Sequence, residues 1–415
     1  LYAWWKAWPL PNKQPNPNSN RWFALSGLLA GLALYTYMAG RAVPIFYALF
    51  VFYLLLFQRD LFKQHWRGIV LFWILLILAA LPLVVYLGAN PGAEFRISEV
   101  DAPLRALMAG DLRPVLSNGV KILGMFGLSG DPLWRQNVAG RPVFDPLLAL
   151  FFYGGLLLAL LRFVKPPYAH LLLWLAASAL PSLVTADAPS SIRMINALLV
   201  ITVFPVLVIN IIARLSTLSP QLSTKIAYLL GLAFFIAHIW WTSFDVFHRW
   251  PQNEEVQFVW QKALTDVARY LDRSPAAGGA AIGGWSPAIM DPPTMQLTLR
   301  RDDLPLRYFG SDSQTEPIST VIIPTWGAVI AGRSPFAGES THLFHPAIRD
   351  LAPGLAAQLS SWSSGPIDLG SFVSYELDTP AAGSGTIAAG DSFDDQIQLI
   401  QYRLPEDVAA CSRSG

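Results

Sequence analysis

The stretch GIVLFWILLILAALPLVVYLG (68–88) decides the fold class. It runs for 21 residues without a charged side chain, and a helix needs roughly 20 apolar residues to cross a bilayer core. The stretch is apolar all round, whereas a helix on a soluble protein keeps one polar face. Six further uncharged runs, two of them short, extend the prediction to a mainly α-helical, polytopic bundle with seven membrane spans: 22–40, 42–58, 146–161, 168–186, 194–213 and 226–244. Only Arg41 separates the first two runs, so they are expected to form a tight hairpin.

The composition agrees with a membrane protein. Of 415 residues, 53% are hydrophobic and 14% are charged, and the mean hydropathy is +0.41. Soluble domains carry about 25% charged residues, so an ordinary cytosolic enzyme and a disordered chain are both excluded. Cys411 is the only cysteine, which excludes an internal disulfide and a cysteine-based zinc site.

The basic residues predict the orientation of the bundle in the cytoplasmic (plasma) membrane. One alternate set of connecting segments holds ten Lys and Arg against one acid, and the opposite set holds eight against seven. Because basic connections stay inside, the amino end is expected to be cytoplasmic and the carboxyl end extracytoplasmic. The net charge also changes along the chain, from +10 over residues 1–244 to −9 over residues 245–415.

The texture of the sequence predicts four parts. They are a cytoplasmic segment (1–21), the transmembrane bundle (22–244) with an outer loop at 89–145, an extracytoplasmic α/β domain (245–378), and a linker with the start of a truncated β-rich domain (379–415). Apolar residues at helical spacing in 100–126 favour short helices lying on the membrane surface. Beyond the bundle we expect an amphipathic helix at 254–273 and strands at 304–309, 319–323, 326–331, 371–377 and 396–404.

No motif indicates soluble nucleotide chemistry or metal hydrolysis. The sequence has no GxxxxGK[ST], GxGxxG, HExxH or GxSxG, and its six histidines have no metal-ligand spacing. We therefore predict no metal, no cofactor and no nucleic-acid partner. His238, within the last run, is expected to be a packed helix residue.

Charge close to hydrocarbon is costly and often functional, and this directs attention to three segments. YTYMAGR (35–41) places an arginine between two runs, and a guanidinium can bind a phosphate through two hydrogen bonds. GDPLWRQNVAGRPVFDP (130–146) gathers polar side chains beside an aromatic ring, and Arg193 directly precedes the run 194–213. The candidates for binding a phosphate or a substrate are Tyr35, Tyr37, Arg41, Asp131, Trp134, Arg135, Arg141 and Arg193.

Each candidate has a structural alternative. Arg41 can be an interface arginine that only ends a helix, and Arg193 can be a cap paired with Asp187. The segment 130–146 can be a proline-stiffened loop with internal salt bridges. Three further outer-loop acids, Glu94, Glu99 and Asp101, are expected to be solvated.

Several segments resemble a known family. GLLAGLALYTYMAGRAVP (27–44) resembles part of the bacterial membrane glycosyltransferases of the GT-C class, in the branch of protein-mannosyltransferases and aminoarabinose transferases (glycosyltransferase family 39 type). GDPLWRQNVAGRPVFDP and APSSIRMINAL (188–198) look like further pieces of the same proteins, and FDDQIQLIQYRL (393–404) is similar to the first strand of a β-sandwich that follows some of them. The likeness is good over residues 20–215 and loose beyond.

The resemblance implies a GT-C fold and glycosyl transfer on the outer face of the membrane. The donor would be a sugar on a polyprenyl phosphate, and the acceptor a protein or a lipid or glycan. The catalytic residue of the family is an acid in the first outer loop, which this sequence lacks, so no catalytic residue is assigned. Tyr35, Tyr37 and Arg41 match a segment placed near the donor cavity. We expect the chain to be an inactive fragment of a hexosyl or pentosyl transferase that lacks its amino-terminal part.

A transport or lipid-handling membrane protein with an extracytoplasmic carbohydrate-binding domain remains the main alternative. Transporters usually contain inverted repeats and broken helices with polar residues at mid-membrane. Here no repeat is visible and the charges gather at one surface, which favours the enzyme. A third interpretation is a binding module that the helices merely anchor. An anchor needs only one span, so the seven predicted spans argue against it.

Overall fold

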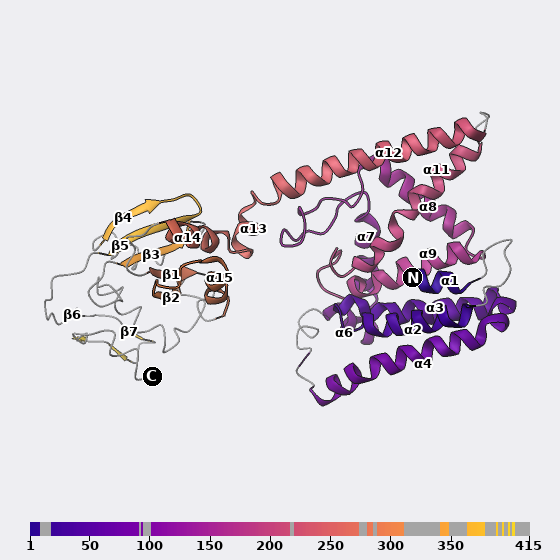
Figure 1. The fold of residues 1–415 in the computed structure, drawn as a ribbon, viewed down its shortest axis with the longest axis horizontal. Coiled ribbons are helices and arrows are strands. Elements are labelled where there is room, and N and C mark those ends of the chain that lie inside the picture. Colours follow the sequence, from indigo (N-terminus) through magenta and orange to yellow (C-terminus); the bar gives the residue numbers. More distant parts are fainter. Residues whose placement is uncertain are drawn as a thin grey trace. The chain divides into compact units, whose positions relative to one another are not determined.

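The computed structural model divides the chain into two compact units, Leu1–Trp250 and Pro251–Gly415 (Figure 1). The first unit ends at Trp250, whereas the sequence placed the boundary after Phe244. The structure describes residues 1–8, 18–90, 93, 101–215, 220–273, 280–284, 289–310, 341–347 and 363–377, and four pairs at 387–388, 392–393, 397–398 and 401–402.

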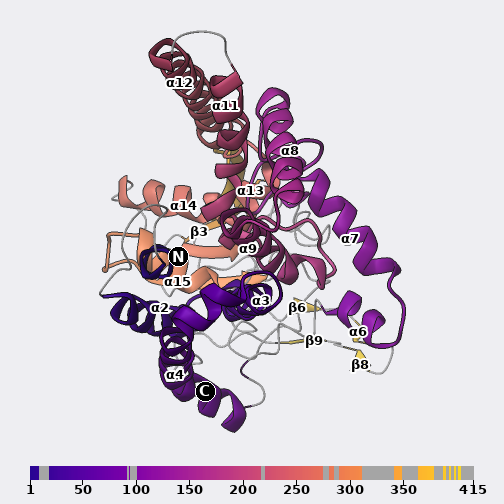
Figure 2. The same ribbon diagram turned by 90° about the vertical axis from the view of Figure 1, so that its right-hand side faces the viewer.

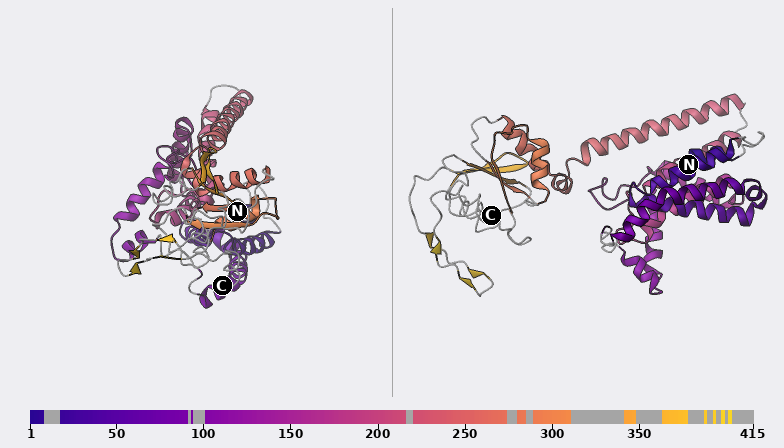
Figure 3. Two further views of the ribbon diagram at one scale, coloured as in Figure 1. Left: turned by 90° about the vertical axis from the view of Figure 1, so that its left-hand side faces the viewer. Right: turned by 60° about the horizontal axis from the view of Figure 1, so that its bottom comes forward.

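The described part of the first unit is almost entirely helical. Its longest members are α4 (Arg59–Ala89) and α12 (Pro220–Phe244), the second of which is seen along its length in Figures 1 and 3. The other elements, in chain order, are α1 (Tyr2–Ala7), α2 (Ser19–Ala33), the 3₁₀ helix η1 (Met38–Arg41), α3 (Ala42–Phe57), α6 (Ala102–Met108), α7 (Arg113–Gly124), α8 (Pro146–Leu161), α9 (Pro166–Leu183), the 3₁₀ helix η3 (Ile195–Ala197), α10 (Leu198–Ile201), α11 (Val203–Leu215) and the π-helix η4 (Asp245–Arg249).

Several of these helices are long and apolar enough to cross a bilayer, which supports a membrane location. Among the described residues there are four: Met38–Phe57, Arg59–Ala89, Ile195–Ala213 and Tyr228–Arg249. Helices α8 and α9 meet the same criterion only as a pair bent by 120°. The part of the chain that the structure describes therefore supports four or five crossings, and the seven predicted spans and their orientation are not shown.

The first predicted run, 22–40, is the clearest difference. Helix α2 ends at Ala33, because the chain turns at residues 34–37 and the Thr36 hydroxyl donates to the carbonyl oxygen of Ala33 (2.7 Å). The next helical stretch then begins at Met38. The hairpin that the sequence placed at Arg41 thus lies a few residues earlier, and Arg41 belongs to the start of the next helical stretch.

The amino end packs against the rest of the bundle. The Trp4 side chain of α1 is completely buried, and its ring contacts those of Phe23, Tyr47 and Phe72 at 4.8–5.2 Å. Residues 1–8 therefore belong to the core of the bundle. The sequence placed them in the segment 1–21, whose basic residues are Lys6, Lys13 and Arg21.

Two glycines allow helices of the bundle to approach closely. A Cβ on Gly27 of α2 would lie 2.2 Å from the carbonyl oxygen of Phe72 in α4, and one on Gly155 of α8 would lie 1.9 Å from that of Phe204 in α11. Small residues serve this purpose in membrane helix packing, where van der Waals contact replaces hydrophobic burial.

The second unit contains a mixed five-stranded sheet with the order β2-β1-β3-β5-β4. Its strands are β1 (Ala280–Gly284), β2 (Leu306–Gly310), β3 (Thr341–Pro346), β4 (Ser363–Asp368) and β5 (Phe372–Leu377). Strand β1 is parallel to β2 and β3, with Ala280 opposite Leu306 and His342, while β3–β5 and β4–β5 are antiparallel. Two of the predicted strands, 304–309 and 371–377, correspond to β2 and β5, and those at 319–323 and 326–331 lie outside the described residues.

The predicted amphipathic helix at 254–273 is divided in two. Helices α13 (Glu254–Val259) and α14 (Lys262–Arg273) meet at Gln261, whose φ of 51° breaks the helix. The Gln261 side chain is buried and donates to Asp291 of α15 (Asp291–Thr298) at 3.0 Å, so a tertiary contact overrides the helical pattern. The apolar face of α14, centred on Val267 and Leu271, packs into the core of the sheet.

The remaining described strands are short. They pair as β6 (Ile387–Ala388) with β9 (Gln401–Tyr402) and β7 (Ser392–Phe393) with β8 (Ile397–Gln398). The predicted strand at 396–404 overlaps β8 and β9, and the predicted linker at 379–390 is described only at β6.

Candidate functional site

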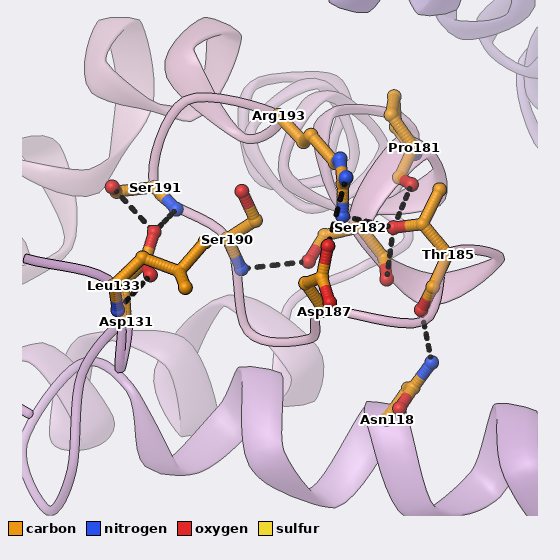
Figure 4. Close-up of polar contacts among 10 residues, drawn as sticks. All are labelled: Asn118, Asp131, Leu133, Pro181, Ser182, Thr185, Asp187, Ser190, Ser191 and Arg193. Atoms are coloured by element: carbon orange, nitrogen blue, oxygen red, sulfur yellow. Dashed lines mark hydrogen bonds and ion pairs between the residues drawn. The ribbon is translucent and has the colours of Figure 1, made fainter. Parts of the chain in front are cut away.

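Asp131 joins two of the three segments that the sequence singled out (Figure 4). Its buried carboxylate accepts hydrogen bonds from the backbone amide and the hydroxyl of Ser191, both at 2.8 Å, and from the amide of Leu133 at 3.0 Å. Segment 130–146 is therefore attached to the hairpin of residues 185–193. A carboxylate with three donors is satisfied in a buried position, so Asp131 positions the hairpin and is not available to a substrate.

Arg193 lies at the end of that hairpin, and its guanidinium is held from two sides (Figure 4). One nitrogen donates to the Thr185 hydroxyl at 2.9 Å, and another lies 3.3 Å from the carboxylate of Asp187. The Arg193 side chain is 19% exposed and that of Asp187 is 49% exposed. The pairing with Asp187 that the sequence offered as an alternative is confirmed. An exposed ion pair is weak, so the Asp187 carboxylate is a replaceable anionic partner.

The hairpin has a second support beneath it. The side-chain amide of Asn118 in α7 donates to the carbonyl oxygens of Leu183 (3.0 Å) and Thr185 (2.9 Å), and the Ser182 hydroxyl accepts from the amide of Ser190 (2.9 Å). Thr185 thus links Asn118 to Arg193. Loop residues held on a rigid scaffold in this way are suited to binding.

The turn that carries Arg41 joins the same end of the bundle. The side chain of Asn196, three residues after Arg193, donates to the carbonyl oxygen of Ala39 in η1 (2.7 Å), and its backbone carbonyl oxygen accepts from the indole of Trp174 (2.8 Å). Arg41 ends η1 and is half-buried. A shallow surface depression begins directly after it, lined by Ala42, Phe46, Trp174 and Asn196, and it is too shallow to enclose a water molecule.

The two tyrosines of the turn have different surroundings. The Tyr35 hydroxyl donates to the carbonyl oxygen of Ala79 (2.9 Å) and accepts from the amide of Leu83 (3.2 Å), beside Pro82 in α4. It therefore stabilises a proline-interrupted turn of the helix, which is a structural role. Tyr37 is 42% exposed.

Arg141 is committed to the end of the last long helix. Its guanidinium lies 2.9 Å from the Asp245 carboxylate, donates to the Thr242 hydroxyl (3.0 Å) and lies over the ring of Trp241 at 4.2 Å. Asp245 is completely buried and also pairs with Arg249 at 3.0 Å. Burial lowers the pKa of Arg141, and the charge of Asp245 opposes that shift.

The remaining candidates lie nearby without entering these networks. Arg135 is exposed, and the backbone carbonyl of Trp134 accepts from the indole of Trp250 at 2.7 Å. The expected internal salt bridges of segment 130–146 are wrong for Asp131 and Arg141, because their partners lie in the 185–193 hairpin and in η4. His238 packs against Phe144 and Trp241, as expected of a helix residue.

Most outer-loop carboxylates of the described first unit are already engaged. Asp101 pairs with Arg105, Asp111 with Arg113, and Asp145 accepts from the first amides of α8. The expectation that Asp101 is merely solvated is therefore wrong, and Glu94 and Glu99 lie outside the described residues. Among the described residues, no group of three metal-ligating side chains could hold an ion.

Sequence reasoning missed the residues that connect the site: Asn118, Thr185, Ser191, Asn196 and Asp245. Asn196 and Asp245 carried a signal, since each is a polar residue in or directly after an apolar run. The other three are short polar side chains in polar surroundings, and only their tertiary contacts distinguish them.

Comparisons with known proteins do not identify a family for this chain. No family model matches the sequence, and no curated protein matches it. One solved structure is similar, the archaeal oligosaccharyltransferase AglB from Archaeoglobus fulgidus in complex with an inhibitory peptide and a dolichol-phosphate. It shares 12% identity with a TM-score of 0.38, over 98% of this chain and 57% of that one. The chain thus spans little more than half of that protein, and a likeness at this score carries no argument.

Proposed function

We propose that the chain belongs to a membrane glycosyltransferase that moves a hexosyl or pentosyl group from a polyprenyl-phosphate donor to an acceptor outside the cytoplasmic membrane. The acceptor is a protein, or a lipid or glycan. The observation that carries the proposal is the joining of three arginine-bearing segments at one end of an apolar bundle. The bonds Ser191–Asp131 and Asn196–Ala39 hold these segments together.

Such an end suits a lipid phosphate. Transfer of the sugar leaves negative charge on the phosphate, and preorganised cationic donors at that point lower the barrier. Arg193 is 19% exposed and shares its guanidinium between Thr185 and the half-exposed Asp187, and Arg41 lies half-buried at the end of η1, at the same end of the bundle. These two arginines are therefore the proposed phosphate ligands, and the lipid-linked sugar is a substrate rather than a cofactor.

The other candidates have supporting roles in this proposal. Asp131 and Arg141 fix the loops through buried contacts, and Tyr35 fixes the turn. Tyr37, Trp134 and Arg135 remain candidates for contacting the sugar or the acceptor. The outer-loop carboxylates among the described residues all have hydrogen-bond or ion-pair partners, so none of them is proposed as the base.

The test is sugar transfer by the natural full-length protein in proteoliposomes, using a labelled polyprenyl-phosphate sugar. Arg41→Ala is expected to lower turnover at least about tenfold, because a charged hydrogen bond contributes about 1.5–3 kcal/mol. Arg162→Ala is the matched control, since that arginine ends α8 and donates to Tyr168. Near wild-type turnover by Arg41→Ala would remove its role, and failure to transfer any lipid-linked sugar would contradict the function.

A further inference from the structure

Helix α7 leaves a row of apolar side chains uncovered. Leu112, Leu116, Val120 and Leu123 are 55%, 65%, 72% and 53% exposed, and their spacing places them on one side of the helix. A soluble protein buries such a row. We call these four residues the α7 stripe.

The opposite side of α7 is fixed, so the stripe cannot turn inward. Asn118 and Ile122 are buried, and Asn118 donates to the carbonyl oxygens of Leu183 and Thr185. The far end of the helix is attached to α8, because the Tyr153 hydroxyl donates to the Leu123 carbonyl oxygen at 2.7 Å. The uncovered side is therefore a built feature of the fold.

The direction of the helix and its charges indicate what covers it. In Figure 2, which looks nearly along α3, helix α7 lies lengthwise across the view, so it runs crosswise to a candidate membrane span. The row Arg113, Ser117 and Lys121 borders the stripe and carries basic charge. Exposed apolar residues also stand at the start of α8, where Leu147 is 55% and Leu150 is 67% exposed. Apolar side chains beside basic ones, on a helix parallel to the surface, are typical of interfacial helices.

We propose that α7 is seated in the headgroup–acyl boundary of a phospholipid leaflet through its stripe, and that Asn118 transmits this seating to the hairpin that carries Arg193. The connection is short, because Asn118 donates to the Thr185 carbonyl and the Thr185 hydroxyl accepts from Arg193. Lipid that holds α7 thereby fixes the arginine. Asn118 is a positioning residue in this scheme and touches no substrate.

The seating can be measured on the whole chain in lipid nanodiscs. Cys411→Ser first removes the only cysteine. Spin labels are then placed singly at Leu116→Cys and Val120→Cys, with Ser117→Cys and Lys121→Cys as matched controls one residue further along. Labels at 116 and 120 are expected to collide with oxygen dissolved in the lipid, and labels at 117 and 121 with a water-soluble nickel chelate. Equal access of the chelate to all four positions would overturn the seating. So would exclusion of both reagents at 116 and 120, which would indicate a protein partner.

The coupling has its own readout in hydrogen exchange of the amides in residues 183–194. Asn118→Ala is expected to speed exchange there about tenfold, because two hydrogen bonds are lost, while Ser117→Ala leaves it unchanged. Leu116→Ser with Val120→Ser, at side chains that are 65% and 72% exposed, is expected to speed the same amides in nanodiscs. If the double variant leaves exchange unchanged, the coupling is overturned even if the seating holds. Neither result depends on sugar transfer.

Discussion

Asp131 and Ser191 lie 60 positions apart in the sequence and are joined by two hydrogen bonds of 2.8 Å. Ser191 gives both its backbone amide and its hydroxyl to one buried carboxylate oxygen. These two hydrogen bonds join the 130–146 segment to the hairpin that carries Arg193. The position of the arginine therefore depends on Asp131, a residue with no substrate contact.

Replacing Asp131 by Asn is expected to lower the free energy of unfolding of the first unit by about 2–4 kcal/mol, because a side-chain NH₂ or a single amide oxygen cannot accept all three donors. Thermal unfolding in detergent, followed by tryptophan fluorescence, measures the change. Ser191→Ala is the milder comparison, since it removes only the hydroxyl bond and is expected to cost about 1 kcal/mol. Equal losses in the two variants would contradict the role given to the carboxylate.

Substitutions of Arg193 and Asp187 are expected to have opposite effects on lipid-phosphate binding. Arg193→Gln is expected to weaken binding of a polyprenyl phosphate by about tenfold or more, because a charged hydrogen-bond donor is lost. Asp187→Asn is expected to strengthen it about two- to fivefold, since the carboxylate that competes for the guanidinium is an exposed partner of low energy. Equilibrium binding in nanodiscs measures both. Weaker binding by Asp187→Asn would mean that Asp187 supports the arginine instead of competing with the ligand.

Substitution of Asp245 tests whether its ion pair with Arg141 anchors the 130–146 segment to the end of the last long helix. Asp245→Ala leaves the charge of Arg141 buried without its acid, and loss of one partner of a buried pair costs about 3–5 kcal/mol. Arg249→Ala removes the exposed partner of the same carboxylate and is expected to cost about 0–1 kcal/mol. The two variants are compared by thermal unfolding and by limited proteolysis within residues 130–146. Similar stability of both would show that the ion pair with Arg141 does not hold the segment.

Gly154 and Gly155 form a natural pair of test and control for helix packing. An alanine Cβ at Gly155 would meet the Phe204 backbone at 1.9 Å, whereas one at Gly154 would meet only the tip of Val208 at 3.3 Å. We expect Gly155→Ala to separate α8 from α11 and to cost about 1–3 kcal/mol or more. Gly154→Ala should change stability by less than about 0.5 kcal/mol. Unfolding in detergent distinguishes them, and a neutral Gly155→Ala would refute the close approach.

The second unit is expected to lose stability in acid through Asp266. Burial alone would raise the pKa of this carboxyl, but hydrogen bonds from Lys262 and Ser371 and the charges of Lys262 and Arg269 outweigh it and hold the pKa below its ordinary value. A lowered folded-state pKa gives stability that is present above the unfolded-state pKa, about 3.9, and lost as the pH falls through the folded-state value. Asp266→Asn should therefore reduce the pH dependence of unfolding below about pH 4. An unchanged acid profile in this variant would contradict the assignment.

The helices could be predicted from the sequence because a buried apolar segment must satisfy its backbone internally. The runs at 42–58 and 68–88 are helical for this reason. The hairpin at residues 34–37 was missed, since its turn depends on a Thr36 side-chain bond inside an uncharged run. Strand β1 was missed because AAIGG has no side chains typical of strands and pairs on both edges only through tertiary contact.

The sequence indicated which segments contribute to the candidate site, but not which of their residues contact one another. Arg41, Asp131 and Arg193 were identified from charge next to hydrocarbon. Their connections through Asn196 and Ser191 join residues 157 and 60 positions apart, and no periodicity reports such contacts. For the same reason Arg141 was expected to face a ligand, although a buried acid beyond the last run holds it.

The most direct test of the central claim is saturable binding of polyprenyl phosphate to the reconstituted chain, measured beside the double variant Arg41→Gln with Arg193→Gln. Arg162→Gln serves as the control for the loss of one surface charge. The account predicts saturable binding by the wild type and the control, and a loss of at least about a hundredfold in the double variant, as expected for two charged hydrogen-bonding groups. Binding of equal strength by the double variant, or no saturable binding by the wild type, would contradict it.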